Sequence, residues 1–169
     1  MTLPARQQAR PASFAATAEE HLDDVYAYLV YLTRDRSLAE DLTADTFEKA
    51  LKLWRRFDSR RASARTWLCQ IARTTALDWF RSEDRRQKRE HRAAVPEHVD
   101  AVFAEGLSPS IEAALAELSA GEREVIALRV LLDLDGEEAA RVLGISPTAV
   151  STRLSRALKK LEEKVIVNV

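Results

Sequence analysis

The side chains best suited to chemistry lie near the C-terminal end, in a segment whose charged residues are all basic. Residues 141–161 carry five Lys and Arg and no acidic residue. Gly144 suits a tight turn because glycine tolerates positive φ. Ser146 suits a helix N-cap, and Pro147 suits the first helical position. The pattern predicts a helix-turn-helix whose second helix enters the DNA major groove. At 100° per residue, its outward face carries Thr152, Ser155, Arg156 and Lys159.

A second candidate site combines aromatic and basic side chains within residues 66–81. Trp67, Trp79 and Phe80 fall in this segment together with Arg73. Aromatic rings that alternate with arginines suit single-stranded DNA, because bases stack on the rings while the cations hold the backbone. The alternative is that the rings pack in a helical core, which is the commoner role of such residues. We adopt that alternative for most of the rings individually.

The residues that would indicate catalysis or a bound cofactor form no recognisable pattern. Cys69 is the single cysteine, so the chain can form neither an internal disulfide nor a cysteine-based zinc site. The three histidines lack metal-ligand spacing, and the sequence has neither a glycine-rich phosphate loop nor an HExxH motif. We therefore predict that the protein is not an enzyme and has no cofactor and no metal. Cys69 is expected to be a buried small hydrophobe in a protein of the reducing cytoplasm.

The overall charge conceals a marked asymmetry along the chain. The 26 Lys and Arg nearly balance the 27 Asp and Glu, yet residues 55–92 have a net charge of +7 and residues 97–138 have one of −9. Together with residues 141–161, this gives two separate cationic blocks, which favour a nucleic-acid partner. The longest apolar run, residues 25–32, is far shorter than the roughly 20 residues needed to cross a bilayer. We expect no membrane insertion.

Composition and capping signals predict an all-α protein of two small helical domains joined by a flexible linker. Glycine and proline together make up 9 of 169 residues, so turn-formers are scarce. Thr17 with Glu20 and Ser37 with Glu40 match the capping box that opens a helix. A third helix is expected from about Thr66 to Arg92. The predicted units are a disordered tail (1–16), a first domain (17–92), a linker (93–110) and a helix-turn-helix domain (111–169).

Three further start signals divide the second domain into short helices. Ser108 and Pro109 open the first of them. Ser119 with Glu122 forms a capping box for a helix to about Leu132, and Asp135 with Glu138 forms another for the first helix of the helix-turn-helix.

Four segments in this order resemble one family. They are residues 39–54 (AEDLTADTFEKALKLW), 66–81 (TWLCQIARTTALDWFR), 118–144 and 145–161. The chain resembles a bacterial RNA polymerase sigma factor of the extracytoplasmic-function (ECF) group. The resemblance implies that it binds core RNA polymerase, directs promoter-specific initiation, and is controlled by an anti-sigma factor. A free-standing helix-turn-helix regulator is the alternative function.

The resemblance also implies roles for particular residues. The clamp helices of the polymerase largest subunit would bind Asp41, Leu42, Asp45, Thr46, Phe47 and Glu48. The minus-10 element would be recognised and opened by Phe57, Arg60, Arg61, Arg65, Trp67, Ile71, Arg73, Thr74 and Arg81. The minus-35 element would be read by Ser151, Thr152, Arg153, Ser155, Arg156 and Lys159.

Three positions depart from the family pattern. Thr74 stands where the family usually has Asn, Ala44 where it usually has Gln, and Ser151 where a cation is common. Promoter preference therefore cannot be transferred from relatives by this resemblance.

Overall fold

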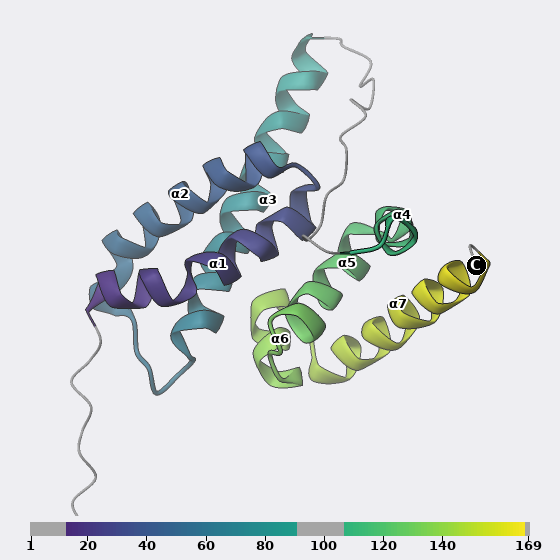
Figure 1. The fold of residues 1–169 in the computed structure, drawn as a ribbon. Coiled ribbons are helices and arrows are strands. Elements are labelled where there is room, and N and C mark those ends of the chain that lie inside the picture. The colour runs from purple at the N-terminus through teal and green to yellow at the C-terminus, as the bar shows by residue number, and fades with distance from the viewer. Residues whose placement is uncertain (1–12, 91–106, 168–169) are drawn as a thin grey trace, which may run out of the picture.

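The computed structural model describes residues 13–90 and 107–167, and every element in these ranges is helical. Three long helices form the first region (Figure 1): α1 (Phe14–Thr33), α2 (Arg36–Leu53) and α3 (Ala64–Glu90). A short 3-10 helix, η1 (Trp54–Arg56), follows α2. The all-α prediction is confirmed. Residues 1–12 and 91–106 lie outside the described ranges, so most of the predicted tail and linker is not tested.

The first two helices begin earlier than the capping boxes predicted. Ser13 caps α1, its side chain accepting a hydrogen bond from the Ala16 amide, so the predicted start at Thr17 is wrong. Asp35 caps α2 in the same way and replaces the predicted start at Ser37. In both cases a matching Ser/Thr-x-x-Glu pattern lies inside the first turns of the helix, where it serves no capping role.

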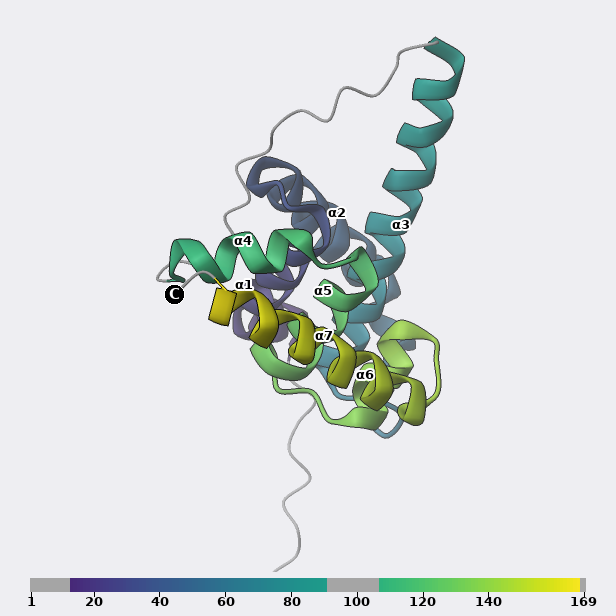
Figure 2. The ribbon, with the colours of Figure 1, turned by 90° about the vertical axis from the view of Figure 1, so that its right-hand side faces the viewer.

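Small side chains let α1, α2 and α3 approach closely. Ala39, Ala50, Ala72 and Ala76 are fully buried along the helix contacts. The first region also buries threonine hydroxyls, and in α2 they donate to the carbonyl four residues earlier at 2.6 Å, which satisfies them without a partner from another helix. The charged second half of α3 extends beyond the bundle (Figure 2).

The second region contains α4 (Pro109–Glu117), α5 (Ala120–Ile126), the π-helical turn η2 (Ala127–Leu131), α6 (Gly136–Leu143) and α7 (Pro147–Val167). The predicted caps are confirmed at Ser108 and in the capping boxes that begin at Ser119 and Asp135. Gly144 has φ +66° between α6 and α7, as its position in the predicted turn requires. The helix-turn-helix prediction is therefore confirmed in its geometry.

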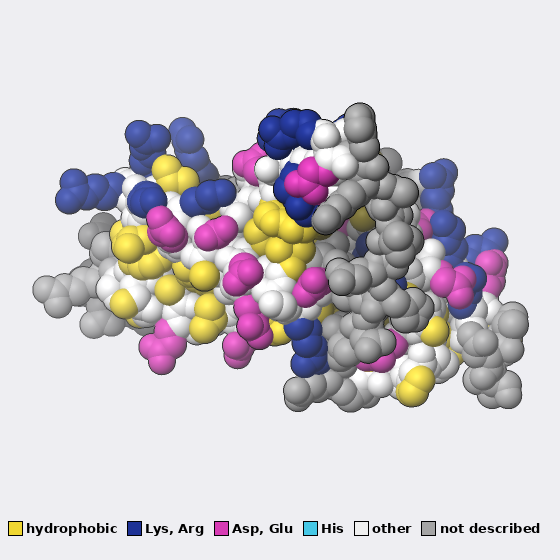
Figure 3. All heavy atoms as spheres, turned by 90° about the horizontal axis from the view of Figure 1, so that it is seen from above, with side chains coloured by type: hydrophobic (Ala, Val, Ile, Leu, Met, Phe, Trp, Pro, Cys, Tyr) yellow, Lys and Arg dark blue, Asp and Glu magenta, His cyan; other side chains and the backbone are white. Residues whose placement is uncertain are grey.

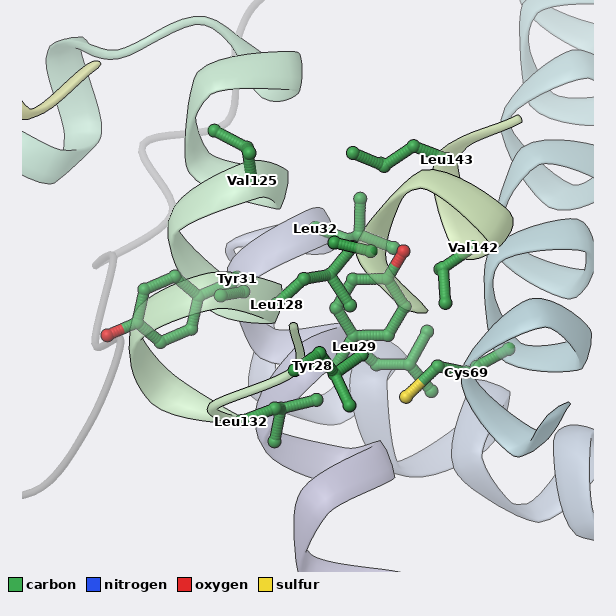
Figure 4. Close-up of a cluster of buried hydrophobic side chains, with 14 of the residues drawn as sticks. Tyr28, Leu29, Tyr31, Leu32, Cys69, Val125, Leu128, Leu132, Val142 and Leu143 are labelled. Atoms are coloured by element: carbon green, nitrogen blue, oxygen red, sulfur yellow. The ribbon is translucent and has the colours of Figure 1, made fainter. Parts of the chain in front are cut away.

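The two regions pack directly against each other. Helix α6 lies on α3, and α5 and η2 lie on α1. Tyr28, Leu29 and Cys69 from the first region meet side chains of the second region in one buried cluster (Figure 4). The labelled members from the second region are Val125, Leu128, Leu132, Val142 and Leu143. The hydrophobic core is therefore continuous across the two regions, which the sequence patterns did not predict.

Candidate nucleic-acid interface

Helix α7 presents the predicted outward face to solvent. Ser151, Thr152, Ser155, Arg156 and Lys159 are all exposed, whereas Val150 and Ala157 are fully buried on the opposite side. The Thr152 hydroxyl donates to the Thr148 carbonyl at 3.0 Å, so its oxygen still has a lone pair to offer outward. This face combines short acceptors with cations, the side chains that meet base edges and phosphates.

A hollow of about 660 Å³ lies beside this face, between the start of α5 and the start of α7. Arg153 and Arg156 line it together with Ser119 and Gly121. The Arg153 guanidinium crosses close to Gly121, where a Cβ would stand 3.5 Å from Nη1. The hollow therefore places two guanidinium groups beside the outward face of α7, an arrangement suited to a phosphate backbone.

In the first region, Trp67 packs in an aromatic cluster, whereas Trp79 and Phe80 meet each other edge-on at 5.4 Å and Trp79 is 38% exposed. Trp54 and Phe57 stack with centroids 5.2 Å apart, and Phe57 lies 5.0 Å from Trp67. Phe14 meets Trp54 edge-on at 5.5 Å. Most ring faces therefore have an aromatic neighbour, which favours the core interpretation of Trp67 and Phe57. Their packing also fixes the start of α3.

An apolar hollow of about 450 Å³ opens between α2 and α3. Trp67, Ile71 and Thr74, all predicted minus-10 residues, line it with Lys49 and Lys52. Lys49 Nζ donates to the Thr75 hydroxyl at 3.2 Å, which positions one ammonium at the rim. An apolar floor with cations at its edge could receive one unstacked base and hold its phosphate.

The predicted minus-10 arginines differ in whether they already form ion pairs with acidic residues of the chain. Arg60 holds Asp58 through two contacts of 3.0 Å, and this hydrogen bonding lowers the pKa of the Asp58 carboxyl to about 2. Arg65 lies 3.7 Å from Asp24. Arg61 and Arg81 are both exposed, and Arg81 forms an ion pair with Asp78 at 3.3 Å.

Arg73 is the predicted minus-10 residue whose surroundings were not foreseen. Its Nε donates to Glu124 Oε1 at 2.7 Å, across the contact between the regions. The Tyr28 hydroxyl donates to the same oxygen at 2.6 Å. Burial raises the pKa of Tyr28 well above its ordinary value, and the Glu124 carboxylate adds to this rise. Sequence reasoning missed Glu124 and Tyr28 because no local pattern links residues so far apart.

The predicted polymerase-binding residues of α2 fall into two groups. Asp41, Asp45 and Glu48 are exposed, and Phe47 is half-buried. Leu42 and Thr46 are only 1% and 0% exposed, so direct contact by these two side chains is revised to a supporting role in the core. The exposed acids are thus held on a helix whose opposite face is fixed by close packing.

Beside these acids, a groove runs between α1 and α2. Leu22, Tyr26, Ala44 and Phe47 line it together with acidic residues. Seen from above, hydrophobic and acidic side chains lie next to one another over this part of the molecule (Figure 3).

Other kinds of site have little support in the structure. Within residues 13–90 and 107–167, no group of three or more potential ligand side chains could hold a metal ion. Among the helices described, none is both long and apolar enough to span a membrane. Cys69 is fully buried, and desolvation raises the pKa of its thiol to about 12. A thiol in this setting is poorly reactive.

Two family models match the chain, and together they cover both regions. The model described as Sigma-70 region 2 matches residues 17–86, and the model described as Sigma-70, region 4 matches residues 109–161. The ECF RNA polymerase sigma factor SigC of Mycobacterium tuberculosis is 38% identical over 138 residues, covering 79% of this chain and 73% of SigC. SigX of Bacillus subtilis is 29% identical over 163 residues, covering 89% of this chain and 82% of SigX.

A solved structure extends the likeness to the arrangement of helices. The sigma factor RpoE of Bartonella quintana, solved in complex with the anti-sigma factor NepR, superposes with a TM-score of 0.76 at 26% identity. The match covers 92% of this chain and 98% of that one. CnrH in complex with the cytosolic domain of CnrY has the same fold, with a TM-score of 0.67 at 24% identity. Because the matches include both regions, they disfavour a free-standing helix-turn-helix regulator.

Proposed function

The chain belongs to the ECF group of the sigma-70 family, and we propose that its two DNA-facing surfaces act on separate elements of one promoter. In this proposal the outward face of α7 reads the minus-35 element and the hollow between α2 and α3 receives a base of the minus-10 element. The observation that carries it is the pair of chemically different surfaces, one hydroxyl-rich and basic, the other apolar with cationic edges.

At the minus-35 element, α7 enters the major groove and Arg156 contacts base edges. The exposed hydroxyls of Ser151 and Thr152 donate within the helix and offer acceptor oxygens outward, and Ser155 adds a third hydroxyl at the same face. Arg153 and Lys159 hold the flanking phosphates, which fixes the register of the helix on the duplex. The hollow beside α7 supports this division because it places Arg153 next to the exposed reading face.

At the minus-10 element, one base leaves the stack and enters the hollow lined by Trp67, Ile71 and Thr74. Unstacking costs a few kcal/mol, and capture of one base returns roughly 1–3 kcal/mol. The basic loop that contains Arg60 and Arg61 adds phosphate contacts, which release counterions. Since these contributions nearly balance, the free chain is expected to bind promoter DNA weakly and to need core polymerase for opening.

Core polymerase binds the exposed face of α2. Asp41, Asp45 and Glu48 offer a row of carboxylates that suits a basic partner surface, and Phe47 supplies an apolar anchor beside them. An anti-sigma factor would control the chain by covering the same region. The complexes of RpoE with NepR and of CnrH with CnrY support such control by analogy. The protein performs no chemistry of its own in this proposal and works in the cytoplasm.

Run-off transcription tests the proposal. Core polymerase alone and core polymerase with the purified chain are compared on a genomic library of promoter fragments. New, specific start sites that share two spaced elements are the expected result. An unchanged start-site map in the presence of a chain that binds core polymerase would contradict promoter recognition, and repression of existing starts would support a regulator instead.

A further inference from the structure

We propose that Arg34 and Arg123 form a binding site for a small anion that carries a phosphate group, at the point where α5 packs on the end of α1. Arg34 follows α1 directly, and Arg123 lies in α5, which contacts α1 in the fold (Figure 1). Neither residue belongs to the surfaces proposed above for DNA or for core polymerase. The inference therefore goes beyond the proposed function and does not depend on it.

Arg123 is a nearly buried cation whose protein partners are neutral. The residue is only 8% exposed. Its Nε donates to the Tyr31 carbonyl at 3.3 Å, and its Nη1 donates to the Leu118 carbonyl. Among residues 13–90 and 107–167, no carboxylate forms an ion pair with it. A buried charge without a counter-ion is costly, so this guanidinium is suited to an anion from outside the chain.

Arg34 contributes the second cation, and it too forms no ion pair with a described carboxylate. Its Nε is buried without a hydrogen-bond partner, and no other side-chain nitrogen or oxygen in the described part of the chain is in this state. Its backbone has φ +57°, a left-handed conformation that is unfavourable for a residue with a Cβ. The Arg34 amide holds this conformation by donating to the Val30 carbonyl at 2.8 Å. An orphaned donor on a strained residue points to a functional constraint.

The two guanidinium groups are near enough to repel one another. Burial lowers the pKa of Arg123, and the positive charge of Arg34 lowers it further. An anion bound between the two groups would replace this repulsion by two attractions. Each guanidinium presents parallel N–H groups that match the oxygens of a phosphate, so a phosphate group is the anion that suits the pair best.

The exposure of the two arginines limits the size of the ligand. Arg34 is half-buried and forms the side of the site that is open to solvent, whereas Arg123 forms the enclosed side. A DNA duplex is too bulky to reach a guanidinium this buried, but inorganic phosphate or the terminal phosphate of a nucleotide is small enough. Once bound, the anion would join the end of α1 to α5 and stabilise the folded chain increasingly as its concentration rises.

Isothermal titration calorimetry of the full chain with inorganic phosphate tests the site, at an ionic strength kept constant with sodium chloride. We expect saturable binding of one phosphate per chain. Arg34→Gln removes the cation with the orphaned nitrogen and should weaken binding about tenfold or more. Arg34→Lys keeps the charge but lacks the planar fork, so its affinity should be intermediate. Arg36→Gln is the matched control, because Arg36 is an exposed arginine of the same turn, and it should bind phosphate like wild type.

A parallel titration with ATP distinguishes the two sources of the phosphate group. Tighter binding of ATP than of inorganic phosphate, lost in Arg34→Gln, would assign the site to the terminal phosphate of a nucleotide. Equal or weaker binding of ATP would assign it to free phosphate.

Thermal unfolding followed by circular dichroism gives an independent measurement and confirms that each variant is folded. Phosphate should raise the midpoint of wild type and of Arg36→Gln above the midpoint in chloride of equal ionic strength, and should raise that of Arg34→Gln less. The inference is overturned if wild type shows no saturable binding, or if folded Arg34→Gln binds phosphate as tightly as wild type. It is also overturned if Arg36→Gln loses as much affinity as Arg34→Gln, since binding would then reflect general positive charge. These measurements use the free chain, so their failure is distinguishable from a failure of the sigma function in run-off transcription.

Discussion

The two DNA-facing surfaces differ in how ready they are to bind. In the second region, the outward face of α7 is exposed, and the Ser151 and Thr152 hydroxyls are satisfied within their own helix. In the first region, Arg73 is held by Glu124 and the start of α3 is held by Glu138. One surface is exposed and the other is partly covered. A recognition surface can therefore be correctly folded and still be partly covered by another region of the same chain.

The largest expected effect concerns the first region and its polymerase-binding face. Asp45→Arg places a cation among Asp41 and Glu48 on the exposed side of α2. Like charges brought together across an interface cost several kcal/mol, so binding to core polymerase should weaken on the order of 100-fold. A pull-down with purified core polymerase measures this. Glu162→Arg makes the same charge change at an exposed position of α7 and should leave binding unchanged. Equal binding by both variants would mean that the α2 face is misassigned.

In the second region, Arg156→Ala should cost roughly 1–3 kcal/mol in promoter use if the guanidinium contacts a base edge. The loss should be confined to promoters with an intact minus-35 element, as measured by initiation from matched intact and scrambled templates. Lys159→Ala separates the two kinds of contact. If Lys159 binds a phosphate, its replacement should lower initiation from all templates similarly. It should also reduce the slope of log affinity against log salt concentration by about one. If Arg156→Ala lowers initiation equally from scrambled and intact templates, Arg156 does not contact a base edge.

Local signals predicted the second region better than the first. The capping boxes at Ser119 and Asp135 were recognisable because each cap and its glutamate partner are three residues apart, at the very start of the helix. The same pattern failed at Thr17, because Ser13 opens α1 without an acidic partner three residues on. A short pattern cannot tell the first residue of a helix from one in its second turn.

The contact between the regions had no local signal at all. Glu124 lies 51 residues from Arg73 and 96 from Tyr28. In the sequence it is one acidic residue among many, and a solvated position is the default for such a side chain. The resemblance assigned Leu42 and Thr46 to polymerase contact, but both side chains are buried against neighbouring helices, which a likeness in sequence does not show. The helix-turn-helix could be predicted because its caps and its glycine turn depend on local sequence.

Thr74→Asn should have a smaller effect, confined to recognition of the minus-10 element. Thr74 is exposed at the edge of the apolar hollow, and its hydroxyl donates to the Gln70 carbonyl at 3.0 Å. Asparagine reaches farther and offers both a donor and an acceptor. We expect a changed base preference at one minus-10 position, worth about 1–2 kcal/mol by analogy with other base contacts. Initiation from libraries randomised at the minus-10 or the minus-35 element measures it, and only the minus-10 profile should change.

The smallest expected effect tests whether the two regions unfold as one unit. Gly144→Ala puts a Cβ on a residue with φ +66° in the second region, at a cost of about 1 kcal/mol. Gly136→Ala is the control within the same α6, where a Cβ meets nothing within 4 Å and φ is not positive. It should be neutral or slightly stabilising.

The position of the tryptophans makes the measurement decisive. Trp54, Trp67 and Trp79 all lie in the first region, so tryptophan fluorescence during urea unfolding reports that region alone. A continuous core predicts that Gly144→Ala lowers the fluorescence midpoint as much as the midpoint from circular dichroism, because coupled regions share one transition. If the fluorescence midpoint stays fixed while part of the dichroism transition moves, the regions unfold independently and the shared core does not couple them.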